Sequence, residues 1–314
     1  MATCLTVGLL YPGEMGASLG TLLAGRGVRV VTTLAGRSER TACRARDAGL
    51  VILSSLADLV RESSIVFSLV ETSAAAQVAQ SYAALAAAAP DGAIYVDVNS
   101  IGPELASQIG ALITAAGVDF IDASINGLAK NLSTGGTFFL SGPRADEVAQ
   151  LVGPAVRTRV LGGEIGRASA MKMLLGGLSK GLCALFLELA ALAQRRDMLA
   201  EMMDACTMIY PGITALIDRM LPTYARHAGR RATEMTELKS TARHADMAPC
   251  VIDAIRDLHE LMAGVEFADQ DGASVAALVE RVVSAGLFDF EHAPLAASRT
   301  NGLAVTNCLE PRLS

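Results

Sequence analysis

The residues of this sequence best suited to move a proton are two lysines in one long apolar run. The run carries only three charges among its alanines, leucines and methionines: Lys172, Lys180 and Glu188. Lys172, Gly176, Ser179 and Lys180 recur at helical spacing, so they would lie on one small, polar face of a helix. A lysine that is partly removed from water can exchange a proton near neutral pH. We therefore predict that this face is the wall of a cleft, with Lys172 as the catalytic general acid/base.

The same helix is apolar on every side and contains two adjacent glycines, Gly176 and Gly177. Helices of this kind are usually buried at the centre of a large protein. Each glycine costs roughly 1 kcal/mol relative to alanine in a helix interior, which suggests that another group approaches the backbone closely. The alternative is that the glycines pack against a neighbouring helix and that Lys172 extends to water.

A second candidate site follows the first apolar run, at the turn Gly8-Leu-Leu-Tyr-Pro-Gly-Glu-Met-Gly16. Dinucleotide-binding domains place glycines at such a turn, so that backbone N–H groups and the helix dipole face the pyrophosphate. Gly13 and Gly16 match the second and third glycines of the GxGxxG fingerprint, whereas Tyr11 replaces the first. We expect five residues to bind the cofactor here: Tyr11, Pro12, Gly13, Glu14 and Met15. An ordinary strand-to-helix turn is the alternative.

The second apolar run is followed by a basic loop that favours NADP over NAD. Enzymes that bind NAD carry an acidic residue here for the ribose hydroxyls, whereas those that bind NADP carry cations for the 2′-phosphate. No Asp or Glu occurs from Val28 to Ser38. Arg37, Ser38 and Arg40 supply guanidinium groups and a hydroxyl that suit a phosphate. A solvated basic loop without a ligand is the alternative interpretation.

Short apolar runs alternate with helical patterns over the first half of the chain. The predicted strands are at 5–10, 28–32, 51–53, 65–70, 94–98, 120–122 and 137–141. This alternation predicts an α/β fold with a Rossmann-type doubly wound parallel sheet. An all-helical C-terminal domain follows, with helices at 168–195, 198–209, 212–221, 232–244, 251–263 and 274–285. The predicted domains are 1–163 for NADP and 164–314 for substrate and dimerisation, with 168–195 as an interdomain helix.

Composition and charge exclude several classes of protein. Of the 314 residues 52% are hydrophobic, which is enough for two cores. A net charge of −6 argues against nucleic acid, and four histidines without ligand spacing argue against a metal. The six cysteines form no CxxC pair and are expected to be reduced and buried. Charges interrupt the longest apolar run and the first residues lack a basic leader, so we predict a cytoplasmic protein without a membrane span.

Four motifs in this order resemble the β-hydroxyacid dehydrogenase family, which includes 3-hydroxyisobutyrate and 6-phosphogluconate dehydrogenases. The turn at 8–16 is similar to the family's GxxGxGxMG, and Asp97-Val-Asn-Ser-Ile-Gly-Pro103 is similar to its substrate motif. Asp122-Ala-Ser-Ile-Asn-Gly127, followed by Gly-Gly-Thr at 135–137, resembles DAPVSGG…GT. Gly166 precedes Lys172 at the family's spacing. The likeness is greatest to a branch described as phosphogluconate dehydrogenase-like.

The resemblance implies a nicotinamide-dependent dehydrogenase in which Lys172 is the catalytic lysine. It implies that the substrate's polar group is held by Ser100, Asn126 and Gly127, and we add two residues further along the helix, Gly176 and Lys180. Two residues at the ends of predicted strands are expected to contact the cofactor: Val70 and Asn99. The helical half carries more apolar faces than a small bundle can bury, which predicts a homodimer, as the resemblance also implies.

The chain departs from the family pattern at Leu175 and Gly176, where relatives carry an amide that orients the lysine and the substrate. Ser179 and Lys180, one turn further along, can substitute for it. Glu234 and Glu237 are expected to be exposed helix charges. We predict an NADP-dependent oxidoreductase that transfers a hydride between the nicotinamide and a small hydroxy acid or oxo acid. The alternatives are an imine reductase-like enzyme and a non-catalytic NADP(H)-binding regulator.

Overall fold

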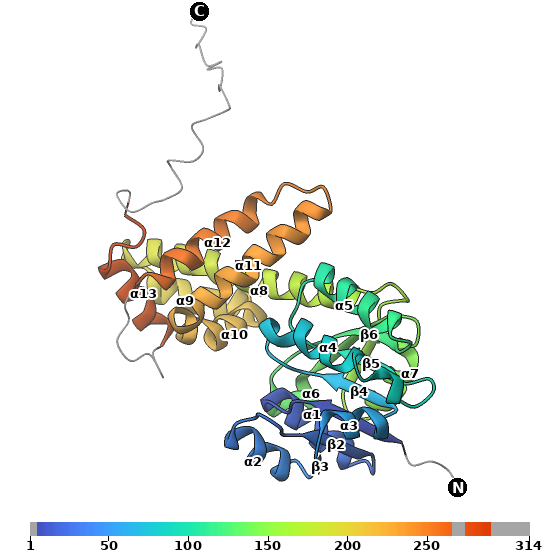
Figure 1. The fold of residues 1–314 in the computed structure, drawn as a ribbon. Coiled ribbons are helices and arrows are strands. Elements are labelled where there is room, and N and C mark those ends of the chain that lie inside the picture. Colours follow the sequence, from blue (N-terminus) through green and yellow to red (C-terminus); the bar gives the residue numbers. More distant parts are fainter. Residues whose placement is uncertain (1–4, 266–273, 290–314) are drawn as a thin grey trace, which may run out of the picture. The chain divides into compact units, whose positions relative to one another are not determined.

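The chain divides into two compact units, residues 1–175 and 176–314, of which the computed structural model describes residues 5–265 and 274–289 (Figure 1). Each unit has buried apolar clusters of its own. The division falls between Leu175 and Gly176, which is later in the chain than the predicted boundary after residue 163. It lies inside the long helix, because the first turns of that helix are bound to the sheet of the first unit.

The first unit is built on one sheet with eight strands: β1 (Thr6–Leu10), β2 (Arg29–Thr33), β3 (Val51–Leu53), β4 (Ile65–Ser68), β5 (Ile94–Asp97), β6 (Asp119–Asn126), β7 (Thr137–Ser141) and β8 (Arg157–Val160). Their order is β3-β2-β1-β4-β5-β6-β7-β8. Neighbouring strands are parallel except β6 and β7, which pair antiparallel. The first six strands have the order of a doubly wound dinucleotide-binding sheet, so the predicted fold class is confirmed.

Helices cover both faces of this sheet (Figure 1). One face is covered by α1 (Glu14–Ala24), α2 (Glu39–Asp47), α6 (Leu132–Gly135) and α7 (Ala145–Val152), and the other by α3 (Leu56–Glu62), α4 (Ala75–Ala83) and α5 (Pro103–Ala115). Four 3-10 turns lie between elements in the described residues: η1 (Thr72–Ala74), η2 (Ala86–Ala88), η3 (Ala129–Asn131) and η4 (Leu221–Thr223). Fully buried strand residues such as Val7, Phe67 and Tyr95 separate the two helical layers.

The second unit is helical throughout its described residues, as predicted. Its helices are α8 (Arg167–Gln194), which begins in the first unit, then α9 (Leu199–Ile209), α10 (Pro211–Met220), α11 (Tyr224–His244), α12 (Cys250–Ala263) and α13 (Val275–Ser284). Side chains from α8, α11, α12 and α13 form one core, which includes Leu187, Ala228, Met262 and Val279. The predicted tail from 287 onward lies mostly outside the described residues.

Two elements differ from the sequence prediction for physical reasons. β8 was not predicted, because Arg157 and Arg159 alternate with Thr158 and Val160 and leave no apolar run. It is the last strand at its end of the sheet, where charged residues protect the edge. α11 begins at Tyr224 rather than near residue 232, because charged residues hide the periodicity of its first turns.

α8 is only partly buried within the chain. Its 28 residues include a window of mean hydropathy 1.6, of which 33% is buried, so the predicted central burial is not reached. By length and composition it could cross a membrane, although the prediction excluded a span on the basis of its charges. This is weak evidence, because the core helix of a globular protein meets the same criterion. Four leucines at helical spacing are 46–62% exposed: Leu178, Leu185, Leu189 and Leu192.

The cysteines also differ in part from the prediction. Cys43, Cys183, Cys206 and Cys250 are all free thiols in the described residues. Only Cys183 is buried, whereas Cys43 and Cys250 are exposed on the outer faces of their helices, so the expectation of general burial was wrong. The other two cysteines lie outside the described residues.

Candidate functional site

The turn between β1 and α1 presents an open helix N-terminus. Gly13 is the N-cap of α1, and its N–H donates to the carbonyl oxygen of Tyr11 at 2.8 Å. A β carbon built on Gly13 would meet no heavy atom within 4 Å, so glycine is not required by packing of the chain itself. Its backbone φ of −69° is open to any residue. The space in front of the first-turn N–H groups is therefore accessible to an anionic ligand.

The glycines around this turn have different tasks. A β carbon on Gly8 would lie 2.7 Å from Ser63 Oγ, so β1 and α3 pack closely only because Gly8 lacks a side chain. A β carbon on Gly20 would lie 2.8 Å from Leu50 Cδ2, whereas one on Gly16 would make ordinary contacts of 3.6 Å or more. Gly20, rather than the fingerprint residue Gly16, thus permits the closest packing of α1.

The basic loop after β2 is joined to this turn by one aromatic contact. The guanidinium carbon of Arg37 lies 4.0 Å from the centre of the Tyr11 ring. Ser38 is the N-cap of α2, and its Oγ accepts from the N–H of Thr41 at 3.3 Å. Arg40 is exposed in the first turn of the same helix. The residues predicted to bind the 2′-phosphate therefore lie together at the start of α2, and Arg37 joins them to the turn before α1.

Asn99 connects the ends of β4 and β5. Its side-chain oxygen accepts from the N–H of Val70 at 2.6 Å, and its Nδ2 donates to Ser68 Oγ at 3.1 Å and to Asp97 Oδ2 at 3.0 Å. Asn99 is 2% exposed. The side chain predicted to contact the cofactor is thus occupied in fixing the loops that follow the two strands, and Val70 is placed through it.

Two carboxyl groups lie next to each other inside the sheet. Asp97 and Asp122 are register partners on the parallel strands β5 and β6, and each is 1% exposed. Burial raises the pKa of Asp97 to about 7, although hydrogen bonds from Asn99 act in the opposite direction and the negative charge of Asp122 adds to the rise. Asp97 therefore takes up its proton at a much higher pH than an exposed aspartate does.

Asp122 holds the beginning of the long helix. Its Oδ2 accepts from the N–H groups of Gly166, Ala168 and Ser169 at 3.0, 2.9 and 3.0 Å. Ser141 Oγ donates to the same oxygen at 3.1 Å, and Ser169 Oγ donates to Oδ1 at 2.6 Å. These five bonds place the carboxylate at the positive end of the α8 dipole. Asp122 on β6 thus does for α8 what an N-cap side chain does for its own helix.

The half-buried Lys172 lies on α8, three residues beyond Ser169, and is positioned within the first unit. Ser100 follows β5 and Asn126 ends β6, so both are at the carboxyl edge of the sheet where α/β proteins bind ligands. Both are exposed. Gly127 has φ of +144°, and a β carbon there would lie 2.8 Å from the α carbon of Gly136, so this position requires glycine.

Lys180 belongs to an ion pair inside the second unit. Its Nζ lies 2.8 Å from Glu234 Oε2 of α11, and its side chain is 11% exposed. A β carbon on Gly176 would lie 3.0 Å from this Nζ, so the ammonium lies along the helix where residue 176 has no side chain. Arg230 also pairs with Glu234 at 2.5 Å. The expectation of an exposed Glu234 was wrong, because its ion pair with the buried Lys180 keeps the carboxylate partly buried among the helices.

The second glycine of the pair, Gly177, packs against a neighbouring helix. A β carbon there would collide with the side chain of Leu238 on α11, and one on Gly181 would lie 3.0 Å from Ile255 Cδ1 on α12. The group that approaches the helix backbone at Gly177 is thus a side chain of a neighbouring helix, as in the alternative interpretation of the two glycines. The described residues contain no group of three His, Cys, Asp or Glu side chains that could hold a metal ion.

Sequence reasoning missed Asp122, Ser141 and Glu234 as structural determinants of the site. A signal for Asp122 exists, since an acidic residue inside a buried strand must have partners. Its partners, however, lie 19 to 47 residues away on the chain.

Comparisons with known proteins agree with this geometry. Residues 6–158 match the NAD binding domain of 6-phosphogluconate dehydrogenase, and residues 193–262 match a domain of unknown function. The chain is 28% identical over 254 residues to an uncharacterized 28.5 kDa protein of Methanothermus fervidus, covering 80% of this chain and 96% of that protein.

Among solved structures, one conserved protein of unknown function with structural similarity to 3-hydroxyacid dehydrogenases is 30% identical, with a TM-score of 0.66. The match covers 83% of this chain and all of that protein. The 3-hydroxyisobutyrate dehydrogenase of Mycobacterium tuberculosis, solved with L-serine, shares the fold with a TM-score of 0.72, 18% identity and coverage of 88% and 99%. This chain belongs to the β-hydroxyacid dehydrogenase family of NAD(P)-dependent oxidoreductases.

Proposed function

We propose that this protein is an NADP-dependent oxidoreductase that transfers a hydride between the nicotinamide and a small hydroxy acid or oxo acid. The observation that carries the proposal is the open N-terminus of α1 at Gly13, with Arg37 stacked beside it on Tyr11. The helix N-terminus suits the pyrophosphate, and the exposed Arg37 guanidinium suits a 2′-phosphate. Equal dissociation constants for NADP and NAD would contradict the preference.

Lys172 is proposed as the general acid/base. A bound nicotinamide supplies the site that accepts or donates the hydride. When an alcohol is oxidised, the C–H bond breaks as hydride leaves, the O–H proton passes to the Lys172 amine, and a carbonyl forms. Asp122 supports this role by anchoring the helix that carries the lysine. Ser100, Asn126 and the backbone of Gly127 are proposed to hold the substrate's polar group at the carboxyl edge of the sheet, and Lys180 and Gly176 are kept as predicted substrate contacts.

The assignment of Lys172 is tested with Lys172→Met, which keeps the length of the side chain. Loss of proton transfer should lower kcat by about 100-fold or more, whereas loss of a mere binding contact would mainly raise KM. NADP affinity should be unchanged, because the proposed pyrophosphate site lies at the α1 turn. A variant with near-native kcat would contradict the assignment.

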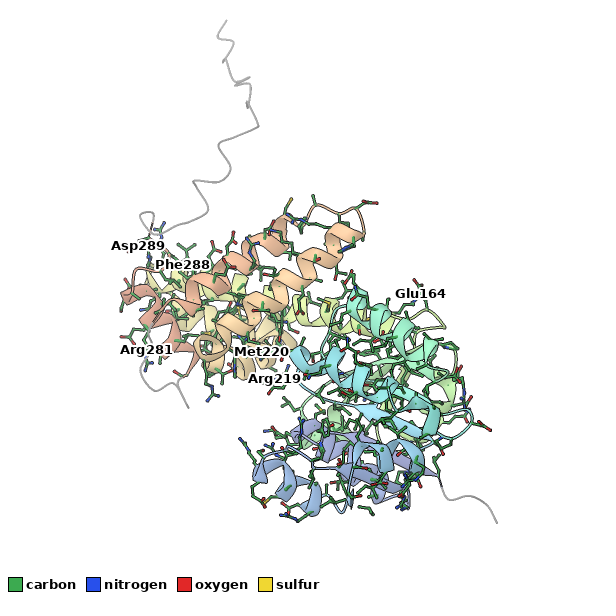
Figure 2. All side chains as sticks on the ribbon, in the orientation of Figure 1. Glu164, Arg219, Met220, Arg281, Phe288 and Asp289 are labelled. Atoms are coloured by element: carbon green, nitrogen blue, oxygen red, sulfur yellow. The ribbon has the colours of Figure 1, made fainter. Side chains whose placement is uncertain are left out.

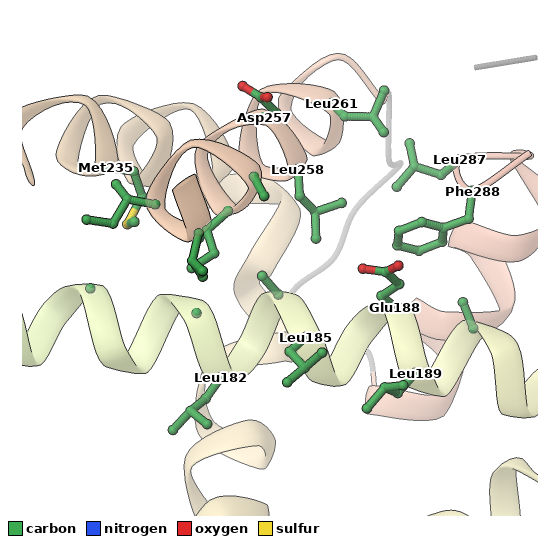
Figure 3. A pocket seen from close by; sticks show the side chains of 18 of the residues that line it. Leu182, Leu185, Glu188, Leu189, Met235, Asp257, Leu258, Leu261, Leu287 and Phe288 are labelled. Atoms are coloured by element: carbon green, nitrogen blue, oxygen red, sulfur yellow. The ribbon is translucent and has the colours of Figure 1, made fainter. Parts of the chain in front are cut away.

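A homodimer is proposed from the surface of the second unit. Leu178, Leu185, Leu189 and Leu192 leave an apolar stripe on α8. Between α8 and α12 lies a cavity of about 830 Å³, lined by leucines of both helices and by Phe288, with Glu188 at its wall (Figure 3). Contiguous exposed apolar side chains are typical of protein–protein interfaces, and a second copy of the chain is the proposed partner. All described side chains are drawn in Figure 2, which shows Phe288 and Asp289 at the end of the described chain.

A further inference from the structure

The contact between Tyr11 and Arg37 is not required by the fold. Tyr11 stands where the dinucleotide fingerprint has a glycine, yet the turn forms without strain at this residue. Among described residues other than glycine, only Asp197 and Asp246 have positive φ. The bond from Gly13 N–H to the Tyr11 carbonyl closes the turn through the backbone alone. The phenol ring is partly buried against the core between the sheet and α3, α4 and α5, which holds it in place, and it also contacts the guanidinium of Arg37.

Arg37 is a long, exposed side chain on a turn whose preceding residue, Gly36, has φ of +70°. Its Nε donates to the carbonyl oxygen of Ala35 at 3.5 Å. Its backbone N–H donates to the carbonyl oxygen of Leu34 at 2.9 Å. Within the described part of the chain these two bonds leave the donors of both terminal guanidinium nitrogens for a ligand. The flat guanidinium lies on the face of Tyr11 at 4.0 Å, a geometry that fixes its plane.

The acidic residue that directly follows this loop in the sequence is paired with a cation. Glu39 forms an ion pair with Arg46 at 3.0 Å, and this pairing lowers the pKa of Glu39. Its charge is thereby partly neutralised, which lowers the repulsion that a phosphate would meet at the loop. The environment of Arg37 therefore favours an anion over a ribose hydroxyl.

We propose that Tyr11 is a specificity-determining residue that sets the preference for NADP by holding the guanidinium of Arg37 ready for the 2′-phosphate. The inference rests on the proposed NADP dependence and names the residue that produces it. An unrestrained arginine loses rotamer freedom when it binds phosphate, whereas one already stacked on a ring loses less. Tyr11 is a positioning residue, because it acts through Arg37. Its effect on the affinity for NADP therefore requires the arginine.

The test is a double-mutant cycle on cofactor affinity, measured by isothermal titration calorimetry with NADP+ and with NAD+. Tyr11→Leu should weaken NADP+ binding about fivefold more than it weakens NAD+ binding, the scale of one exposed cation–π contact. Tyr11→Phe keeps the ring and should stay within twofold of the native protein. Arg37→Ala should weaken NADP+ binding by about 10-fold or more, the scale of one charge-assisted hydrogen bond to phosphate. In the Arg37→Ala background, Tyr11→Leu should have no further effect.

Two results would overturn the inference alone. One is a native protein that prefers NADP+ through Arg37 but is insensitive to Tyr11→Leu. The other is an equal loss of both cofactors, or a loss that persists without Arg37, since Tyr11 would then contact the nucleotide itself. A native protein that binds both cofactors equally, and is indifferent to Arg37→Ala, would instead refute the proposed NADP dependence and the inference with it. An unchanged midpoint of thermal unfolding shows that each variant is folded.

Discussion

Replacing Asp122 by asparagine should destabilise the first unit far more than its small change in shape suggests. The carboxylate accepts five hydrogen bonds, three of them from backbone N–H groups at the start of α8. Asparagine retains one oxygen and places an N–H2 group where the other oxygen accepted. With the amide nitrogen in the place of Oδ2, three backbone N–H donors face a donor, and each buried donor left unpaired costs roughly 1–3 kcal/mol. In the other orientation the N–H2 group faces Ser169 Oγ, which can accept only by turning its own hydrogen away, and the helix N-terminus still loses its negative charge. Breaking a buried charged network of this kind costs about 3–5 kcal/mol in total.

Relief of the neighbouring Asp97 opposes this loss, because the charge of Asp122 raises the pKa of Asp97. We therefore expect a net decrease of about 3 kcal/mol in the free energy of unfolding, at the low end of that range. The assay is urea unfolding followed by circular dichroism at pH 7. NADP should raise the midpoint of the transition that belongs to the first unit, which identifies it.

The matched control is Asp119→Asn on the same strand. Asp119 is 45% exposed in its side chain and pairs with Arg144 at 2.8 Å, so its loss should cost less than about 1 kcal/mol. If Asp122→Asn proves no more costly than Asp119→Asn, the carboxylate does not anchor α8 and the reasoning fails.

Three further predictions concern pH, the cofactor turn and assembly. Burial lowers the pKa of His259 from 6.5 to about 3, so between these pH values the unfolded chain binds a proton that the folded chain does not. The free energy of unfolding of the second unit should therefore fall by up to about 4 kcal/mol as the pH falls from 6.5 towards 3. Thermal unfolding measured across this pH range should show the loss, and His259→Phe should abolish it. The effect of pH on stability is reversed for Asp97, because burial raises its pKa from 3.8 to about 7 and the folded chain binds the proton more tightly. The first unit should therefore gain stability as the pH falls through 7, and Asp97→Asn should remove this gain. Gly13→Ala should leave the unfolding midpoint unchanged, because its methyl group meets no protein atom within 4 Å. The same variant should weaken the binding of NADP+ and of NAD+ by about 10-fold or more in calorimetry. Unaltered affinity for both cofactors would place the pyrophosphate elsewhere. Light scattering at micromolar concentration should give a dimer, and charges introduced by Leu185→Glu should produce monomers, whereas a monomeric native protein would contradict the proposed interface.

Much of the fold could be predicted from the sequence because it depends on local patterns. Apolar runs separated by helical periodicity identify most strands of the sheet, and the same periodicity identifies the helical second half. β8 escaped prediction because an edge strand with Arg157 and Arg159 needs no apolar run. The start of α11 escaped because it is defined by buried Tyr224 and Ala228 among charged neighbours.

The site was harder to predict because its key contacts join distant parts of the chain. The sequence placed Lys172 on a helix, but the carboxylate that anchors this helix comes from β6, 47 residues before Ser169. Lys180 pairs with Glu234 on another helix, and no local pattern distinguishes that glutamate from a solvated one. Tyr11 was recognised as a departure from the fingerprint, but its contact with Arg37 depends on how two loops meet.

The most direct test of the account is transfer of deuterium from C4-deuterated NADPH to a carbon of the substrate, followed by mass spectrometry over a panel of short oxo acids and cyclic imines. We expect the native protein to transfer deuterium to at least one oxo acid. Transfer should be at least about 100-fold slower in Lys172→Met at equal NADPH occupancy. Transfer to imines alone would favour an imine reductase. Tight NADPH binding without transfer to any member of the panel would contradict the central claim and indicate a protein that binds the cofactor without using it.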